Sequence, residues 1–243
     1  KENDIFLIFD EIYTNMIYNG KKSAPLSDII GDIPGMSMKG ISKECPWPGA
    51  RCGWIEFYNS EKDDVFARYV NTILTQKMSE VCSTTLPQMA IPKLLTHPEY
   101  EKYLDERVRH YERLSNIAYD ILRDVPYIAV NRPNGAFYMS VVFKEGALNN
   151  RQTLPIEQPG VRDYIEKILD DKVEQDKRFV YYLLGSTGIC VVPLTSFFTS
   201  LPGFRMTLLE KDVSKFEHVV KILAEKIVEY VESTSPAVQP MLA

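Results

Sequence analysis

Residues 5–13 read IFLIFDEIY: five apolar residues run directly into Asp10, and Tyr13 follows three positions later. A short, β-rich run that is apolar on both faces is typical of a strand buried within a parallel sheet. Ligands of open α/β sheets gather at the carboxyl ends of the strands, so Asp10 and Tyr13 are expected at such an edge. The stretch therefore predicts an α/β fold with a site that begins where this strand ends.

Two further strands are predicted, over residues 36–42 and 53–58, and the loop between them carries charged residues. Ser42 and Lys43 end the first of these strands, which places them at the same edge of the sheet. Arg51 lies eight residues after Lys43, within a PGARCGW stretch whose glycines let the backbone approach a ligand closely. The loop is therefore a candidate part of the same site.

The rest of the chain is expected to be helical at first and then of α+β character. A capping box at Ser60–Asp63, in which the Ser60 hydroxyl accepts from the Asp63 N–H, predicts the start of a helix. The other predicted elements are a long helix over residues 98–124, a hairpin around 131–135, a helix over 161–184, strands at 189–192 and 204–209, and a closing helix over 213–231. This order predicts a mostly parallel sheet, a long connecting helix and a smaller α+β domain.

The composition excludes several classes of function. The chain of 243 residues has 28 Lys and Arg against 33 Asp and Glu, and this acidic balance disfavours general nucleic-acid binding. No apolar stretch reaches the ~20 residues that span a bilayer. Four irregularly spaced cysteines indicate reduced thiols in a cytoplasmic protein and no zinc site. With three histidines in total, chemistry is expected to rest on Lys, Asp, Tyr and Arg.

At these residues the sequence resembles the class I/II aminotransferases, the aspartate-aminotransferase-like family of fold-type I pyridoxal-phosphate enzymes. The resemblance consists of Asp-x-x-Tyr at 10–13, Ser-Lys at 42–43 with an arginine eight residues after the lysine, Gly-Ala-Phe-Tyr at 135–138, and Arg205 in a late strand. Each motif is common alone, but their order and spacing agree over nearly all of residues 5–231. The resemblance implies that residues 1–98 are the carboxyl-terminal part of the large cofactor-binding domain and that 99–243 form the small domain with its connecting helix.

The resemblance also implies a role for each residue of the predicted sheet edge. Lys43 would form the Schiff base with pyridoxal phosphate and shuttle the proton at the substrate α-carbon. Asp10 would bond the pyridine nitrogen, and Tyr13 would donate to the phenolic oxygen of the ring. Arg51 would pair with the phosphate, to which Ser42 could add a hydroxyl or backbone contact.

Arg205 would hold the α-carboxylate of the substrate with its bidentate fork, which a lysine cannot reproduce. Lys39 competes with Lys43 for the catalytic role, and Lys43 is preferred because Arg51 follows it at the family spacing. Gly40 stands where the family often has a phosphate-binding serine, so the phosphate shell is expected to be thinner.

The implied activity is transfer of an amino group between an amino acid and a 2-oxo acid, in a cytoplasmic homodimer without nucleic-acid, membrane or metal partners. The same residues also serve other pyridoxal-phosphate reactions, those of a C–S lyase, a decarboxylase or a synthase. A non-catalytic, aminotransferase-like regulator that senses pyridoxal phosphate is an alternative from another class.

We also expect an N-terminal segment of the same protein to be missing. The phosphate turn and the ring-stacking aromatic of the family precede Asp-x-x-Tyr, and neither is found in this sequence. A strand that is apolar on both faces, as residues 5–9 are, needs neighbours on both of its edges.

Overall fold

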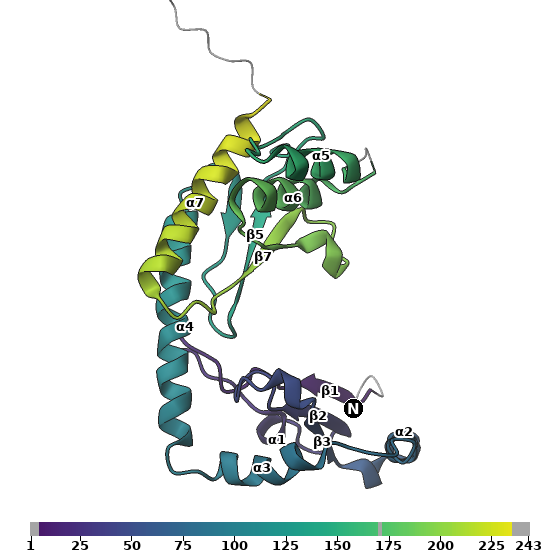
Figure 1. Ribbon diagram of the computed structural model, residues 1–243. Helices are drawn as coiled ribbons and strands as arrows, with labels where there is room; N and C mark the ends of the chain where they lie inside the picture. Colours follow the sequence, from purple (N-terminus) through teal and green to yellow (C-terminus); the bar gives the residue numbers. More distant parts are fainter. Residues whose placement is uncertain (1–4, 170–171, 235–243) are drawn as a thin grey trace, which may run out of the picture. The chain divides into compact units, whose positions relative to one another are not determined.

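The computed structural model describes residues 5–169 and 172–234, which fall into two compact units (Figure 1). The first unit comprises Lys1–His110 and Asn134–Ala136, and the second comprises Tyr111–Pro133 and Phe137–Ala243. No helix among the described residues is both long and apolar enough to cross a membrane.

The first unit contains a three-stranded mixed sheet in the order β1-β2-β3. Its strands are β1 (Leu7–Asp10), β2 (Gly35–Gly40) and β3 (Gly53–Tyr58); β1 and β2 are parallel, and β2 and β3 are antiparallel. The α/β class predicted from the sequence is thus confirmed. The predicted burial of the first strand is wrong for the described residues: β1 lies at an edge of this sheet, and Ile5 and Ile8 are 58% and 48% exposed.

Helices of the first unit flank this sheet and lead towards the second unit. They are α1 (Leu26–Ile29), α2 (Asp64–Lys77), α3 (Thr85–Leu95) and the first half of α4 (Tyr100–Leu122), with 3-10 turns at Pro48–Ala50 and Ser60–Lys62. Phe66 and Val70 of α2 pack on Met36 of β2, which anchors that helix to one face of the sheet. The α4 helix confirms the long helix predicted from the apolar period, whereas α3 was not predicted.

The start of α2 corrects the predicted capping box. Ser60 belongs to the preceding 3-10 turn, and the N-cap is Asp63, whose carboxylate accepts from the Phe66 N–H at 2.6 Å. A carboxylate at this position bonds an otherwise unpaired amide and favours the positive end of the helix dipole.

We therefore expect Asp63→Ala to lower the free energy of unfolding by about 1 kcal/mol. Ser60→Ala is the matched control, and it should change stability by less than about 0.5 kcal/mol. Urea unfolding of the two variants measures both effects. An equal loss of unfolding free energy in Ser60→Ala would instead support the capping box predicted from the sequence.

The second unit contains a four-stranded antiparallel sheet in the order β4-β5-β7-β6. Its elements are β4 (Ile128–Val130), β5 (Tyr138–Phe143), α5 (Pro159–Ile168), α6 (Gln175–Thr187), β6 (Val192–Pro193), a 3-10 turn (Leu194–Phe197), β7 (Gly203–Thr207) and α7 (Val213–Glu232). The closing helix and the hairpin pairing of β4 with β5 are confirmed. The single helix predicted over 161–184 is wrong, because α5 ends at Ile168 and α6 begins at Gln175.

The two faces of this second sheet differ in burial. Phe143 of β5 and Phe204 of β7 lie on one face, where both rings contact Phe179 of α6. Tyr230 of α7 packs against the same Phe179 ring, and all four side chains are buried. Strands alternate their side chains between faces, so Arg205, next to Phe204, projects from the opposite and less buried face.

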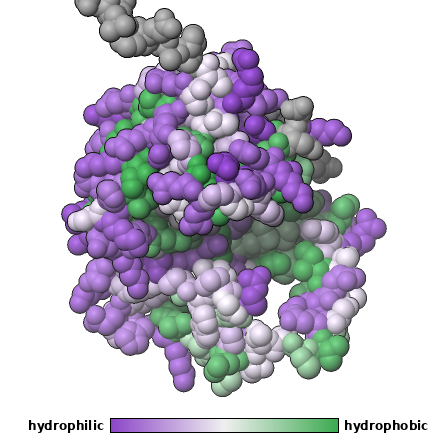
Figure 2. Space-filling model, turned by 45° about the horizontal axis from the view of Figure 1, so that its top comes forward, coloured by the Kyte–Doolittle hydropathy of each residue, from purple (hydrophilic) through white to green (hydrophobic). Residues whose placement is uncertain are grey.

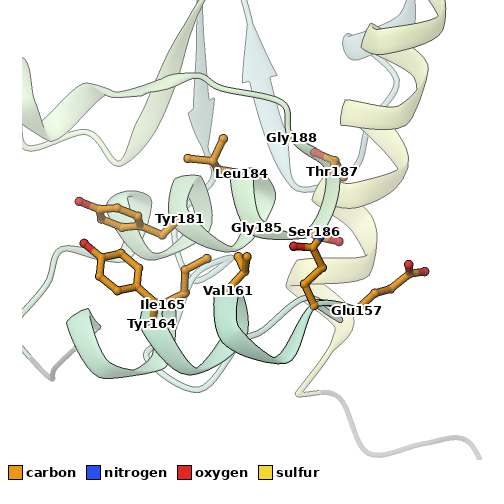
Figure 3. A pocket seen from close by; sticks show the side chains of 11 residues that line it. Glu157, Val161, Tyr164, Ile165, Tyr181, Leu184, Gly185, Ser186, Thr187 and Gly188 are labelled. Atoms are coloured by element: carbon orange, nitrogen blue, oxygen red, sulfur yellow. The ribbon is translucent and has the colours of Figure 1, made fainter.

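A groove of about 480 Å³ lies between α5 and α6 (Figure 3). Gly185 permits the close approach of the two helices, because a Cβ there would meet Ile165 Cδ1 at 2.4 Å. Tyr164 and Tyr181 lie at one end of the groove. On the face shown in Figure 2, hydrophobic areas are scattered among hydrophilic ones. None of the residues that line the groove is a lysine or an arginine, so it does not suit a phosphate-bearing ligand.

Candidate active site

The carboxyl ends of β1 and β2 and the amino end of β3 meet at one edge of the first sheet. Asp10 ends β1 and pairs with Met38, two residues before β2 ends at Gly40. Gly40 in turn pairs with Gly53, the first residue of β3. The loop between these two glycines carries the remaining residues predicted for this edge, Ser42, Lys43 and Arg51.

Lys43 and Tyr13 are close in space at this edge, and both are half-buried. The Lys43 Nζ lies 5.9 Å from the centre of the Tyr13 ring. The carbonyl of Lys43 accepts from Arg107 Nη2 at 3.4 Å, and the carbonyl of Tyr13 accepts from the Met16 N–H at 2.9 Å. The amine and the phenol are thus held by two separate backbone segments.

The side chain of Asp10 is anchored at the end of its strand. Its Oδ1 accepts from the Ile12 N–H at 3.1 Å, which is the turn-capping contact that an aspartate makes after a strand. Among the described residues, no other hydrogen bond reaches this carboxylate. Its second oxygen therefore remains available to a ligand.

Arg51 leaves the 3-10 turn in a left-handed conformation, with φ of 49°, and its side chain is exposed. Its Nη1 donates to the Pro48 carbonyl at 3.1 Å. Among the described residues this is the one hydrogen bond of the Arg51 side chain, which leaves most of the guanidinium donors for an anion.

Lys39 is engaged on the other face of the sheet. Because Asp10 pairs with Met38, the next residue of β2 projects to the opposite side. Its Nζ lies 2.8 Å from Glu56 Oε2 and 3.5 Å from Glu11 Oε2. These ion pairs raise the pKa of Lys39 in spite of its burial, so its amine stays protonated.

Glu11 is a buried carboxylate that joins β1, β2 and α1. It accepts from Ser37 Oγ and from the Leu26 N–H, both at 2.5 Å, and it pairs with Lys39. Burial alone would raise its pKa, but the Ser37 and Leu26 hydrogen bonds and the charge of Lys39 hold the pKa of Glu11 below its ordinary value of 4.5. The ionised form therefore stabilises the end of β1, which carries Asp10, and its contact with β2.

We expect this stabilisation to disappear in acid. A carboxyl whose pKa is lowered by folding contributes stability above its unfolded pKa, and the contribution is lost as the pH falls through the folded-state value. At pH 7, Glu11→Gln should cost about 1.5–3 kcal/mol, and the difference from the unmodified protein should shrink as the pH falls below 4.5. Urea unfolding at pH 7, 5, 4 and 3 tests this; a difference that does not change with pH would contradict it.

Arg205 belongs to the second unit, in β7, and it is half-buried. Its Cζ lies 4.3 Å from the centre of the Tyr138 ring and 4.2 Å from that of Phe197. Among the described residues its side chain has no ion pair or hydrogen bond. Two aromatic contacts thus hold a planar cation whose donors are left for a carboxylate.

Sequence reasoning missed the contacts that hold the Lys43 loop. Glu44 accepts from Asn15 and from the hydroxyl of Tyr100 at the start of α4, and Arg107 of α4 donates to the Lys43 carbonyl. The spacing of a motif contains no signal for these contacts, because they join segments that are distant in the sequence.

A comparison with protein-family models identifies the family directly. The model of "Aminotransferase class I and II" matches residues 1–223 of the chain. The chain belongs to this family.

Curated relatives and solved structures agree with this assignment. The chain is 56% identical over 232 residues to an uncharacterized aminotransferase of Methanocaldococcus jannaschii, and the match covers 96% of this chain and 54% of the relative. It is 34% identical over 137 residues to tyrosine aminotransferase of Caenorhabditis elegans, covering 56% of this chain and 29% of the relative. The structure of alanine aminotransferase from Pyrococcus furiosus superposes with a TM-score of 0.71 at 25% identity, covering 94% of this chain and 50% of that one. The chain thus spans about half the length of the Methanocaldococcus jannaschii and Pyrococcus furiosus proteins.

The sheet edge suits the cofactor that the aminotransferase resemblance implies, pyridoxal phosphate. An aldehyde requires an amine, which Lys43 supplies, and the phenolic oxygen of the ring requires a donor such as the adjacent Tyr13. Asp10 retains a carboxylate oxygen for a protonated ring nitrogen, and Arg51 retains guanidinium donors for a phosphate.

Proposed function

We propose that the protein is a pyridoxal-phosphate-dependent aminotransferase that moves an amino group between an amino acid and a 2-oxo acid. The observation that carries this proposal is the proximity of Lys43 Nζ to the Tyr13 ring, at the edge where Asp10 ends its strand. The family of the chain supports it independently.

In this proposal each residue has one task. Lys43 Nζ holds the cofactor and then carries the proton that leaves the substrate α-carbon. Asp10 keeps the ring nitrogen protonated, Tyr13 donates to the phenolic oxygen, and Arg51, helped by Ser42, binds the phosphate. When bound, pyridoxal phosphate supplies the electron sink for the charge left on the α-carbon.

Arg205 binds the α-carboxylate of the substrate in this scheme. A half-buried arginine that contacts two rings and has no described carboxylate partner is suited to a small anion. Its side chain is already oriented by Tyr138 and Phe197, so little rotamer entropy is lost when the substrate binds.

We further propose that residues 1–98 complete a large cofactor-binding domain, that 99–243 form the small domain, and that the protein works as a cytoplasmic homodimer. The edge position of β1 and the exposed Ile8 favour pairing of that strand with a further, N-terminal segment of the same protein. Expression of residues 1–243 alone tests this pairing. A stable monomer that binds the cofactor tightly would contradict it.

The experiment that tests the activity is an assay of the full-length protein with pairs of amino acids and 2-oxo acids. The proposal predicts that each turnover yields one new amino acid and one new 2-oxo acid, without loss of ammonia or carbon dioxide. Release of ammonia without a new amino acid would indicate a lyase, and release of carbon dioxide would indicate a decarboxylase. Ligand-dependent DNA binding without turnover would indicate a regulator.

A further inference from the structure

Glu44, the residue after Lys43, connects three segments of the first unit through one carboxylate. Its Oε1 accepts from the Asn15 backbone N–H at 3.0 Å, and its Oε2 accepts from Asn15 Nδ2 at 3.1 Å. The same Oε2 lies 3.4 Å from the hydroxyl of Tyr100, the first residue of α4. Two parallel bonds to one residue fix both distance and orientation, which a single bond does not.

Asn15 belongs to the same tight turn as Tyr13. The Thr14 N–H donates to the Glu11 carbonyl at 3.1 Å, and the Met16 N–H donates to the Tyr13 carbonyl at 2.9 Å. Because these bonds close the turn over residues 11–16, a shift of Asn15 moves the Tyr13 ring with it.

The loop that carries Lys43 is closed in a similar way. The Trp47 N–H donates to the Ile41 carbonyl at 3.2 Å, and Arg107 of α4 donates to the Lys43 carbonyl at 3.4 Å. Glu44 therefore joins one closed segment, which bears the amine, to another closed segment, which bears the phenol.

Tyr100 keeps this connection in a single protonation state. Burial and the neighbouring Cys45 and Glu44 raise the pKa of the Tyr100 phenol above its ordinary range, so its hydroxyl remains a donor. Cys45 Sγ lies 3.9 Å from the same hydroxyl, and burial also raises the pKa of this thiol. Tyr100 and Cys45 are thus two ionisable groups beside the Glu44 carboxylate, and Lys22 and Lys39 line the same cavity.

We propose that Glu44 is a positioning residue for transamination: it sets the Tyr13 phenol at a fixed distance from the Lys43 amine. The proposal rests on the function proposed above. It assigns Glu44 no contact with substrate or cofactor, and it follows from the paired bonds to Asn15 and from the turn that links Asn15 to Tyr13. Displacement of a catalytic group by about 1 Å costs on the order of 100-fold in rate.

The test uses Glu44→Gln in the full-length protein loaded with pyridoxal phosphate. Glutamine keeps the size of the side chain but places an amide NH₂ opposite a donor of Asn15, so one of the two hydrogen bonds between residues 44 and 15 is lost. As Tyr13 loosens, it stabilises the ionised phenolic oxygen of the cofactor less. The pH midpoint of the visible cofactor band should then move upward by about half a pH unit or more. We expect kcat to fall roughly 10- to 100-fold and KM for the amino donor to change little.

Two further variants make the result decisive. Asn15→Ala removes only the hydrogen bond from Asn15 Nδ2 to Glu44, so the pH midpoint of the cofactor band should also move upward, but by less. The double variant, Glu44→Gln with Asn15→Ala, should show no shift beyond that of Glu44→Gln alone. Glu101→Gln, an exposed carboxylate next to Tyr100 on α4, is the matched control and should leave midpoint and kcat unchanged. If Glu44→Gln does not fold, Asn15→Ala carries the test by itself.

The outcomes separate this inference from the proposed function. A protein that shows the visible band and transaminates, but whose midpoint and kcat are the same with and without the Glu44 and Asn15 side chains, would overturn the positioning role alone. An unmodified full-length protein without a visible band or turnover would overturn the proposed function, and the positioning role with it.

Discussion

Full-length Lys43→Ala protein is expected to lose at least about 10⁴-fold of its transamination rate while its fold and melting temperature stay close to those of the unmodified protein. In the proposed function the amine is both the covalent anchor of the cofactor and the carrier of the α-carbon proton, so its removal would take away two contributions at once. Lys43 lies in a loop outside the packed core, and for that reason little stability should be lost with it. Steady-state assays and thermal unfolding measure the two quantities.

Lys21→Ala is the matched control, since Lys21 is an exposed lysine in a loop of the same unit. It should retain full activity. Activity of Lys43→Ala within tenfold of the unmodified protein would remove Lys43 from the site, whereas a loss of activity accompanied by unfolding would assign it a structural role.

The second large effect is expected at Arg205. In Arg205→Lys the positive charge remains, but the planar fork and its stacking between Tyr138 and Phe197 are lost. Loss of one charge-assisted hydrogen bond corresponds to about 1.5–3 kcal/mol, so KM for the amino donor should rise roughly 10- to 100-fold. The cofactor content should not change, because Arg205 has no proposed contact with the cofactor.

Arg123→Lys controls for the substitution itself. Arg123 also lies over a tyrosine ring in the second unit, 5.9 Å from the centre of Tyr119, but it pairs with Asp120 and Asp124 on an exposed surface. Its replacement should leave KM unchanged. Equal KM values for Arg205→Lys and the unmodified protein would place the substrate carboxylate elsewhere.

The sequence predicted the elements whose signal is local. The first three strands, the 3.6-residue period of α4 and the closing helix α7 all came from patterns within a short window, and the structure contains them, although β2 ends at Gly40 and not at residue 42. The proximity of Lys43 and Tyr13 could be expected because both follow the carboxyl ends of parallel neighbours, and parallel strands end at the same edge.

The elements that sequence reasoning missed depend on tertiary context. Helix α3 contains Pro92 in its interior, which argues against a helix by local rules, whereas Pro87 lies in its first turn, where proline is tolerated. The break between α5 and α6 falls within a continuous apolar period. The cap at Asp63 and the Glu44 connection each required knowledge of which amide or side chain lies opposite.

The most direct test of the account is to reduce the full-length, cofactor-loaded protein with borohydride and to map the labelled peptide by mass spectrometry. We predict one pyridoxyl group per chain, on Lys43, because its amine lies beside Tyr13 at the ligand edge of the sheet while Lys39 is paired with Glu56 on the other face. A label on Lys39, or on no lysine of this chain, would contradict the account.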